Sequence, residues 1–225
     1  GGSSGYRRPD MTHLFRLSIA SFVGYLLGNL PSAGIVTRLA GNGHDLTVEG
    51  TGNPGAMNAA LVLGNRWGAV VSAADIAKGA AAAALGRRIA GSDGANAAAT
   101  AAVIGHCHPI GRRGGKGVAT SIGQVIGTVP AYLPLDAAVA FGTTKLPWFR
   151  SRTRAGTHAG SVVWVAATTL WWRRRWPNPG GGEPTWLLPT GAAVSSAVIA
   201  RRFAAEAARV EASTETGGPD EEAAA

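Results

Sequence analysis

The sequence predicts an all-α fold: a polytopic membrane protein of about seven transmembrane helices with two glycine-rich cytoplasmic loops. Only 15% of its 225 residues are charged, whereas typical soluble domains have about 25%. Arg16 is the only charge between residues 13 and 36, and only two charges interrupt residues 118–149. Stretches of this kind reach the length of about 20 residues that a helix needs to cross a bilayer.

Each expected span is an apolar segment bounded by charges, prolines or aromatic residues. The first is expected to bend near Pro31, because proline has no backbone N–H, and the fourth ends at Pro130. The sixth ends in Trp171 and Trp172 followed by three arginines, which is typical of a membrane interface. The seven predicted spans are residues 14–36, 68–90, 94–110, 118–129, 132–149, 158–172 and 185–200.

The ends of the chain differ in composition from the segment between them. Residues 1–12 are expected to be a disordered leader or an expression scar, and residues 13–205 a single transmembrane domain. Residues 206–225 are rich in acidic residues and are expected to form a disordered tail. A long polar connection is expected between the first two spans, at residues 38–67.

The distribution of basic residues indicates the orientation. If the N-terminus lies outside, twelve of the 21 Lys and Arg fall on the inner side and eight on the outer side, with Lys78 inside a span. The positive-inside rule favours this arrangement. Both glycine-rich loops then face the cytoplasm.

Charge and cysteine content exclude several classes of protein. The single cysteine, Cys107, excludes an intrachain disulfide framework. Although it lies between His106 and His108, adjacent residues on one loop do not converge easily on one ion, so we expect no metal and no cofactor. The net charge of +8 comes from basic residues at the ends of apolar runs. This pattern favours membrane lipid headgroups or a phosphate ligand over nucleic acid.

The first glycine-rich loop, residues 50–58, has the sequence GTGNPGAMN. Small residues such as Gly52 and Gly55 let a ligand oxyanion approach the backbone, and the amides of Asn53 and Asn58 add oriented donors. We therefore predict that these four residues bind phosphate. The alternative is that the loop is only a turn.

The second glycine-rich loop, residues 105–120, has the sequence GHCHPIGRRGGKGVAT. It combines backbone N–H groups with concentrated positive charge, which suits phosphate-bearing ligands. A nucleotide-binding P-loop is excluded, because Lys116 is followed by Gly117 and not by Ser or Thr. The basic residues could alternatively serve only to set membrane topology. The candidate phosphate-binding residues are Arg112, Arg113, Gly114, Gly115, Lys116 and Gly117.

Three of the titratable residues inside or beside the spans are candidates for a polar site. Asp75 and Lys78 are three residues apart on one helix face, so they either pair with each other or line a polar site. His106 adjoins the second loop and could accept a proton from a hydroxyl or donate to a phosphate oxygen, or serve only a structural role.

Four motifs in this order carry a resemblance: LLGNLP at residues 26–31, EGTGNPGAMN at 49–58, DIAKG at 75–79, and GHxxP followed by GGKGVAT within 105–120. With these motifs the chain resembles the bacterial acyl-phosphate:glycerol-3-phosphate acyltransferases, the PlsY family. The resemblance implies a seven-helix enzyme of the bacterial inner membrane. It would move an acyl chain from acyl phosphate to the 1-hydroxyl of glycerol 3-phosphate, giving lysophosphatidic acid for phospholipid synthesis. It implies catalytic roles for His106 and Lys116 and a phosphate-binding role for the loops, to which Lys78 adds positive potential.

The chain also departs from the family pattern. Asn29 stands where the family commonly has serine, Thr47 and Leu61 replace arginines, and His108 replaces an aromatic residue. The C-terminal run at residues 200–212 lacks the family's histidine and asparagine.

Losing a charged hydrogen bond should weaken phosphate binding by about 1.5 to 3 kcal/mol, unless Arg38, Arg112 or Arg113 compensates. Two alternatives to an active enzyme therefore stay open. One is a catalytically impaired paralogue that binds phosphate or lipid, and the other is a transporter of a small organic phosphate.

Overall fold

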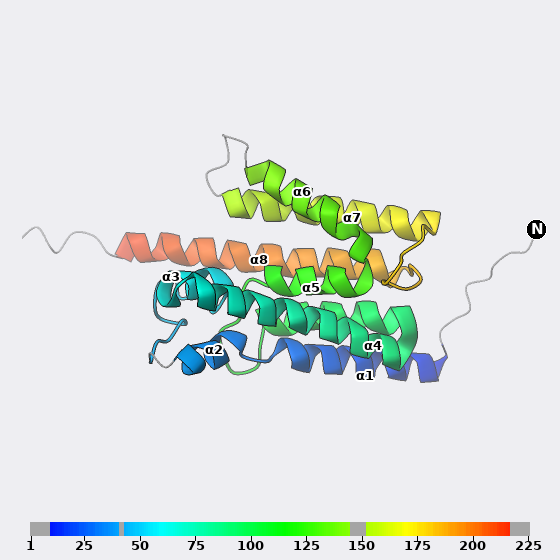
Figure 1. Cartoon of the computed structure of the whole chain (residues 1–225), viewed down its shortest axis with the longest axis horizontal. Helices are drawn as coiled ribbons and strands as arrows, with labels where there is room; N and C mark the ends of the chain where they lie inside the picture. The colour runs from blue at the N-terminus through cyan, green and yellow to red at the C-terminus, as the bar shows by residue number, and fades with distance from the viewer. Residues whose placement is uncertain (1–9, 41–42, 145–151, 217–225) are drawn as a thin grey trace, which may run out of the picture.

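The computed structural model describes residues 10–40, 43–144 and 152–216. Within these ranges every regular element is a helix (Figure 1), which confirms the all-α fold class. The elements are α1 (Met11–Gly28), α2 (Ser32–Ala40), α3 (Ala56–Leu63), α4 (Asn65–Cys107), α5 (Val118–Thr128), a 3₁₀ turn (Pro130–Tyr132), α6 (Leu133–Thr144), α7 (Arg152–Arg174) and α8 (Leu187–Thr216).

Helices α1 and α2 form one apolar segment with a break at the predicted place. Asp10 caps α1, because its carboxylate accepts a hydrogen bond from the His13 N–H at 2.6 Å. The helix ends at Gly28, and Pro31 stands directly before the first residue of α2. The break leaves the carbonyl of Leu30 outside both helices, where it becomes part of the site described below.

Helix α4 is a hairpin rather than one straight rod. A straight helix of 43 residues would be about 65 Å long. Ala90 and Gly91 leave helical geometry, and Gly91 has a φ of +61°. The chain folds back there, so that Gly86 lies against Gly94. The two arms correspond to the second and third predicted spans.

The α4 hairpin is the centre of the molecule. Small residues let neighbouring helices approach its backbone: Gly24 of α1 lies against the carbonyl of Ala98, and Gly123 of α5 against the carbonyl of Ile76. A side chain at either glycine would overlap that backbone. Such small-residue contacts are typical of helices packed in membranes. Helix α8 also packs on α4, and α7 on α8 (Figure 1).

Length and composition identify candidate membrane spans within the described ranges. Two segments are long and apolar enough to cross a bilayer, namely Met11–Ala40 and Asn65–Cys107. Helix α5 and the following Pro130–Val139, bent by 119°, raise this to three if they count as one span. The number of seven spans therefore stays a prediction.

Two segments differ from expectation. The connection at residues 38–67 contains helix α3, whose apolar sequence packs against α4. The tail was expected to be disordered from residue 206, but α8 continues to Thr216. The reason is its high alanine content, which favours helix, together with contacts that tie it to the second loop. Residues 1–9, 145–149 and 217–225 of the predicted leader, fifth span and tail lie outside the described residues.

Candidate active site

The site begins with a buried ion pair inside the α4 hairpin. Asp75 Oδ1 lies 2.8 Å from Lys78 Nζ, and the two side chains are 2% and 7% exposed. Ser32 Oγ donates to the same carboxylate oxygen. Lys78 Nζ also donates to the carbonyl of Leu30 at 2.8 Å, which the α1–α2 break leaves available. From the sequence, Asp75 and Lys78 were expected either to pair with each other or to line a polar site. In the structure they pair, and each also lines one of the two cavities described below.

His106 on the other arm of α4 completes this cluster. Its Nδ1 lies 3.5 Å from Asp75 Oδ1 and 3.5 Å from Lys78 Nζ. The second loop turns back over the imidazole, since the Gly115 N–H donates to the His106 carbonyl at 3.1 Å. A Cβ atom at Gly115 would overlap Nε2 of His106. Glycine at this position is therefore what allows the loop to approach the ring.

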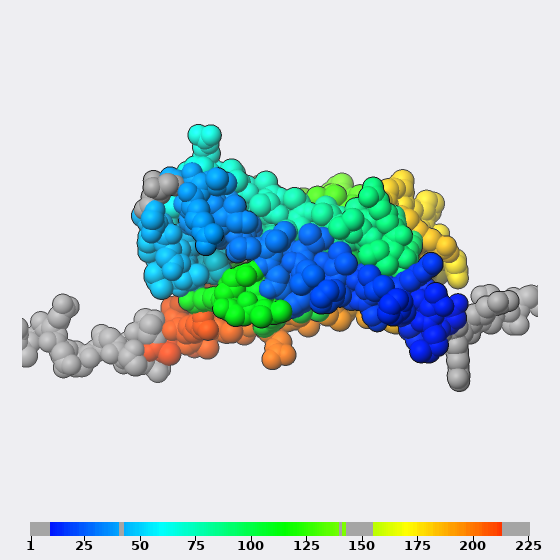
Figure 2. All heavy atoms as spheres, turned by 90° about the horizontal axis from the view of Figure 1, so that it is seen from below, coloured from blue at the N-terminus to red at the C-terminus, as the bar shows by residue number. Residues whose placement is uncertain are grey.

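The C-terminal part of α8 holds the second loop in place. Lys116 Nζ lies 2.8 Å from Glu206 Oε1 and 4.9 Å from the centre of the Phe203 ring. Arg202 donates to the carbonyls of Gly115 and Gly114 at 3.1 and 2.5 Å. In Figure 2 the loop near residue 110 lies between the α1–α2 segment and the C-terminal part of α8.

The first loop is fixed mainly by Asn58. Its Nδ2 donates to the carbonyls of Leu46 and Glu49, and its Oδ1 accepts from the Thr51 N–H. Both amide hydrogens are thus donated to backbone carbonyls that lie just before the loop. A phosphate bound by Asn58 would therefore have to replace one of these backbone acceptors, and the phosphate-binding role of Asn58, which lines the larger cavity described below, stays a prediction.

Two further residues link the first loop to its neighbours. Asn53 Nδ2 donates to Glu206 Oε2 at 3.1 Å. Arg113 of the second loop donates to the carbonyl of Thr47 at 3.2 Å, and its guanidinium lies beside Gly52, whose φ is +63°. Glu206 and Arg113 thus connect the two glycine-rich loops. The sequence analysis expected both loops on the same side of the membrane.

Positive charge gathers where the loops and α8 meet. Desolvation lowers the pKa of Arg113, and the nearby charges of Arg209 and Arg202 lower it further, while Glu206 opposes them. Arginine nevertheless stays charged at neutral pH. The result is a cationic region that also contains the carboxylate of Glu206.

Two cavities meet at His106. The smaller one, of about 110 Å³, has a basic wall made by Lys78, Arg112 and Arg113. The larger one, of about 250 Å³, has a polar end and an apolar wall. Its lining residues include Asn53, Gly55, Asn58, Asp75, Lys116 and Gly117 at the polar end, and Met57, Val118, Ile122 and Phe203 on the apolar side.

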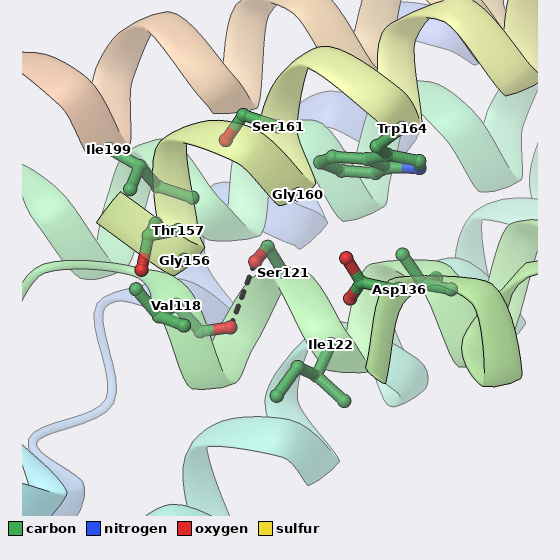
Figure 3. A pocket seen from close by; sticks show the side chains of 11 residues that line it. Val118, Ser121, Ile122, Asp136, Gly156, Thr157, Gly160, Ser161, Trp164 and Ile199 are labelled. Carbon is green, nitrogen blue, oxygen red and sulfur yellow. Dashed lines mark hydrogen bonds between the residues drawn. The ribbon is translucent and has the colours of Figure 1, made fainter. Parts of the chain in front are cut away.

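A third cavity, of about 260 Å³, lies on the other side of α5 and shares Val118 and Ile122 with the larger one. Figure 3 shows Asp136 pointing toward the space below Trp164 and beside Ser121. Most of its lining is apolar or small. It extends the apolar region away from the charged cluster.

The structure brings most of the predicted site residues together. His106, Lys78, Arg112, Arg113, Gly114 and Gly115 line the smaller cavity, and Asn53, Gly55, Lys116 and Gly117 line the larger one together with His106. Gly52 lines neither cavity and instead faces Arg113.

Three further residues of the site were not predicted: Ser32, Arg202 and Glu206. Arg202 and Glu206 are four residues apart and share a helix face with Arg209, a spacing that is visible in the sequence. The expectation of a disordered tail hid this signal. No sequence pattern indicates Ser32, because its side chain faces Asp75 only through the way the chain bends between α1 and α2.

The fold and the site define a class: an all-helical membrane protein whose polar site combines a buried charge cluster with two glycine-rich loops. A family model described as glycerol-3-phosphate acyltransferase matches residues 18–211. The chain belongs to the glycerol-3-phosphate acyltransferase family.

Relatives and solved structures agree with this assignment. Glycerol-3-phosphate acyltransferases from Thermoanaerobacter sp. (strain X514) and Cereibacter sphaeroides (strain ATCC 17025 / ATH 2.4.3) are 37% and 43% identical over 156 and 162 residues. These matches cover 68% and 71% of this chain and 77% and 72% of the relatives. The crystal structure of PlsY (YgiH), an integral membrane glycerol 3-phosphate acyltransferase, in its glycerol 3-phosphate form is similar with a TM-score of 0.68 and 27% identity, covering 90% of this chain and 93% of that one.

Proposed function

We propose that the protein transfers an acyl chain from acyl phosphate to the 1-hydroxyl of glycerol 3-phosphate, forming lysophosphatidic acid and inorganic phosphate. The observation that carries this proposal is the meeting of two unlike cavities at His106. One suits a small anion, and the other suits an anionic head joined to an apolar chain. These are the shapes of the acceptor and the donor of the reaction.

The smaller cavity fits the phosphate of glycerol 3-phosphate. Its basic wall of Lys78, Arg112 and Arg113 supplies charged donors, and hydrogen bonds of this type contribute about 1.5 to 3 kcal/mol each. The larger cavity fits acyl phosphate, with its phosphate at Lys116 and its chain along Val118 and Ile122. Lysine suits this role as a phosphate-binding point charge.

The reaction needs the acceptor oxygen to attack the acyl carbonyl carbon. A carbon–oxygen bond forms to glycerol 3-phosphate, and the bond between the carbonyl carbon and the phosphate oxygen breaks, so inorganic phosphate leaves. The hydroxyl proton goes either to His106 or to the departing phosphate. Lys116 and the N–H groups of the second loop would stabilise the negative charge that develops.

Two arginines of the second loop supply positive charge near a position where a family arginine is replaced. The guanidinium of Arg113 bonds the backbone of Thr47, the position that replaces a family arginine. Of the three arginines considered as substitutes, Arg112 and Arg113 line the basic cavity. This arrangement favours the active enzyme over the impaired paralogue, because cationic groups are retained where phosphate would bind.

The same proposal sets the location of the protein. An enzyme with these substrates would lie in the bacterial inner membrane with its two loops on the cytoplasmic side. Acyl phosphate and membrane lipids would then reach the apolar wall of the larger cavity from the bilayer.

The direct test supplies purified protein with palmitoyl phosphate and glycerol 3-phosphate and measures lysophosphatidate and phosphate. We expect both products from the unaltered chain, and Lys116→Ala should reduce their formation strongly. His106→Asn separates the two proton routes: the rate falls if His106 is the base and changes little if the leaving phosphate is. If the unaltered chain forms no more lysophosphatidate than a sample without protein, the binding paralogue is the better description.

A further inference from the structure

The carboxylate of Glu206 fixes which way the amide of Asn53 faces. An ionised carboxylate only accepts hydrogen bonds, so the group that faces Glu206 Oε2 at 3.1 Å must be the Asn53 NH₂. The amide oxygen of Asn53 consequently points away from Glu206. The orientation follows from the chemistry of the partner and does not rest on telling nitrogen from oxygen.

That amide oxygen is buried and has no hydrogen-bond partner. Asn53 is only 9% exposed, and a buried acceptor without a donor costs about 1 to 3 kcal/mol. A Cβ atom added at Gly55 would stand 3.6 Å from this oxygen, so the oxygen lies beside Gly55, which lines the larger cavity together with Asn53. The atom therefore calls for a donor at the polar end of the larger cavity.

The chemistry of the two substrates decides which of them can supply this donor. A fully ionised phosphate has only acceptor oxygens and cannot satisfy a second acceptor. The hydroxyl groups of glycerol 3-phosphate can donate. Asn53 thus suits the acceptor hydroxyl, in contrast to the phosphate-binding role expected from the sequence.

The second carboxylate oxygen of Glu206 holds Lys116 at 2.8 Å. An ammonium group has three donors, so this ion pair leaves others for a phosphate. A glutamate that orients a phosphate-binding lysine in this way is well known from protein kinases. One carboxylate on α8 therefore sets the positions of a residue on each glycine-rich loop.

We propose that Glu206 is a positioning residue that aligns the two substrates: it turns Asn53 so that its oxygen accepts from the attacking hydroxyl, and it holds Lys116 for the phosphate of acyl phosphate. This inference rests on the proposed function. It assigns Glu206 to the relative placement of nucleophile and leaving group, not to the fold of α8.

The test compares Glu206→Gln, Asn53→Asp and the double variant in the acyl-transfer assay. A glutamine at position 206 can both donate and accept, so the Asn53 amide loses its fixed orientation. We expect kcat to fall about 10- to 100-fold in this variant, as for a misaligned nucleophile, while KM for acyl phosphate changes less than about threefold. Asn53→Asp alone should be worse, because two carboxylates then face each other.

The double variant is the decisive arm. The amide introduced at position 206 can donate to the carboxylate introduced at position 53, whose second oxygen is again an acceptor for the hydroxyl. We expect kcat to recover about 10-fold over Asn53→Asp, a coupling that independent sites would not show. Glu183→Gln is the matched control, since Glu183 is 75% exposed and pairs with Arg175 at 3.4 Å, away from both cavities.

Each other outcome decides against a part of the reasoning. Unaltered kcat in Glu206→Gln, a change confined to KM for acyl phosphate, or a double variant no better than Asn53→Asp would overturn the positioning role. Thermal unfolding of each variant in the same detergent shows whether it folds, and a double variant that folds but stays inactive also counts against the proposal. If the unaltered chain forms no lysophosphatidate, the proposed function fails and this inference fails with it.

Discussion

The buried pair of Asp75 and Lys78 allows its contribution to stability to be separated from its contribution to catalysis. Asp75→Asn would leave Lys78, 7% exposed, without its counter-charge. Breaking a buried pair by removing one partner costs about 3 to 5 kcal/mol, because an uncompensated charge stays buried. His106 and Ser32 lose the same carboxylate.

The double variant Asp75→Leu with Lys78→Met should behave differently. Replacing both charges by apolar groups of similar volume is often neutral or stabilising by about 1 to 4 kcal/mol. We therefore expect the double variant to recover most of the stability that Asp75→Asn loses. Acyl transfer should stay low in it, because the smaller cavity no longer has the charge of Lys78.

The assay is thermal unfolding in one detergent together with the acyl-transfer rate. For a chain of this size, 3 to 5 kcal/mol corresponds to a drop in Tm of about 6 to 20 °C. Asp93→Asn is the control, since Asp93 pairs with His13 at 3.1 Å and is 23% exposed, and such pairs contribute less than about 1 kcal/mol. The reasoning is refuted if Asp75→Asn unfolds at the temperature of the unaltered chain, or if the double variant transfers acyl groups normally.

Three further outcomes are expected. Gly115→Ala should lower stability by about 1 to 3 kcal/mol and reduce acyl transfer, because its Cβ overlaps the His106 ring; Tm and the transfer rate are measured. Arg113→Ala should raise KM for glycerol 3-phosphate about 10- to 150-fold, the equivalent of one charged hydrogen bond, since Arg113 supplies the charge beside Thr47. Hydrogen bonds from the Thr47 side chain and backbone N–H lower the pKa of Asp45 below its ordinary 3.8. The stabilisation that Asp45 gives to the turn at residues 45–47 is therefore complete above pH 3.8 and is lost as the pH falls through the lower folded value. Amide hydrogen exchange of residues 43–50 detects this loss.

Controls for these variants are available in the chain. Gly142→Ala introduces a Cβ with nothing within 4 Å, so it should leave Tm unchanged and show that alanine alone is not harmful. Arg38→Ala removes an exposed arginine outside the basic cavity. A KM increase equal to that of Arg113→Ala would show that overall charge, and not position, sets affinity. Exchange at residues 43–50 that does not rise at any pH below 3.8, after correction for intrinsic rates, would contradict the role of Asp45.

Local sequence patterns were enough to predict the helical frame and the two loops. The scarcity of charge gave the fold class, Pro31 gave the break between α1 and α2, and the glycine motifs gave most residues around the cavities. These features depend on neighbours in the chain, or on composition, and so can be seen without coordinates.

Features that depend on contacts between distant segments could not be predicted. The sequence did not show that Asn58 uses its amide hydrogens on Leu46 and Glu49. Nor did it show that Glu206 reaches both loops, because an acidic, alanine-rich end of a chain has the same composition whether it is disordered or docked. Tertiary contacts decide between these states.

The hairpin form of α4 has a consequence for how the protein enters the bilayer. Asp75 and Lys78 lie one turn apart on one arm, and His106 lies on the other. An isolated charge in the membrane is costly, but Asp75 and Lys78 already compensate each other within one arm, and closure of the hairpin at Gly91 adds His106. The charges that are hardest to insert are thus neutralised by contacts within α4 itself, without any group from α5 to α8.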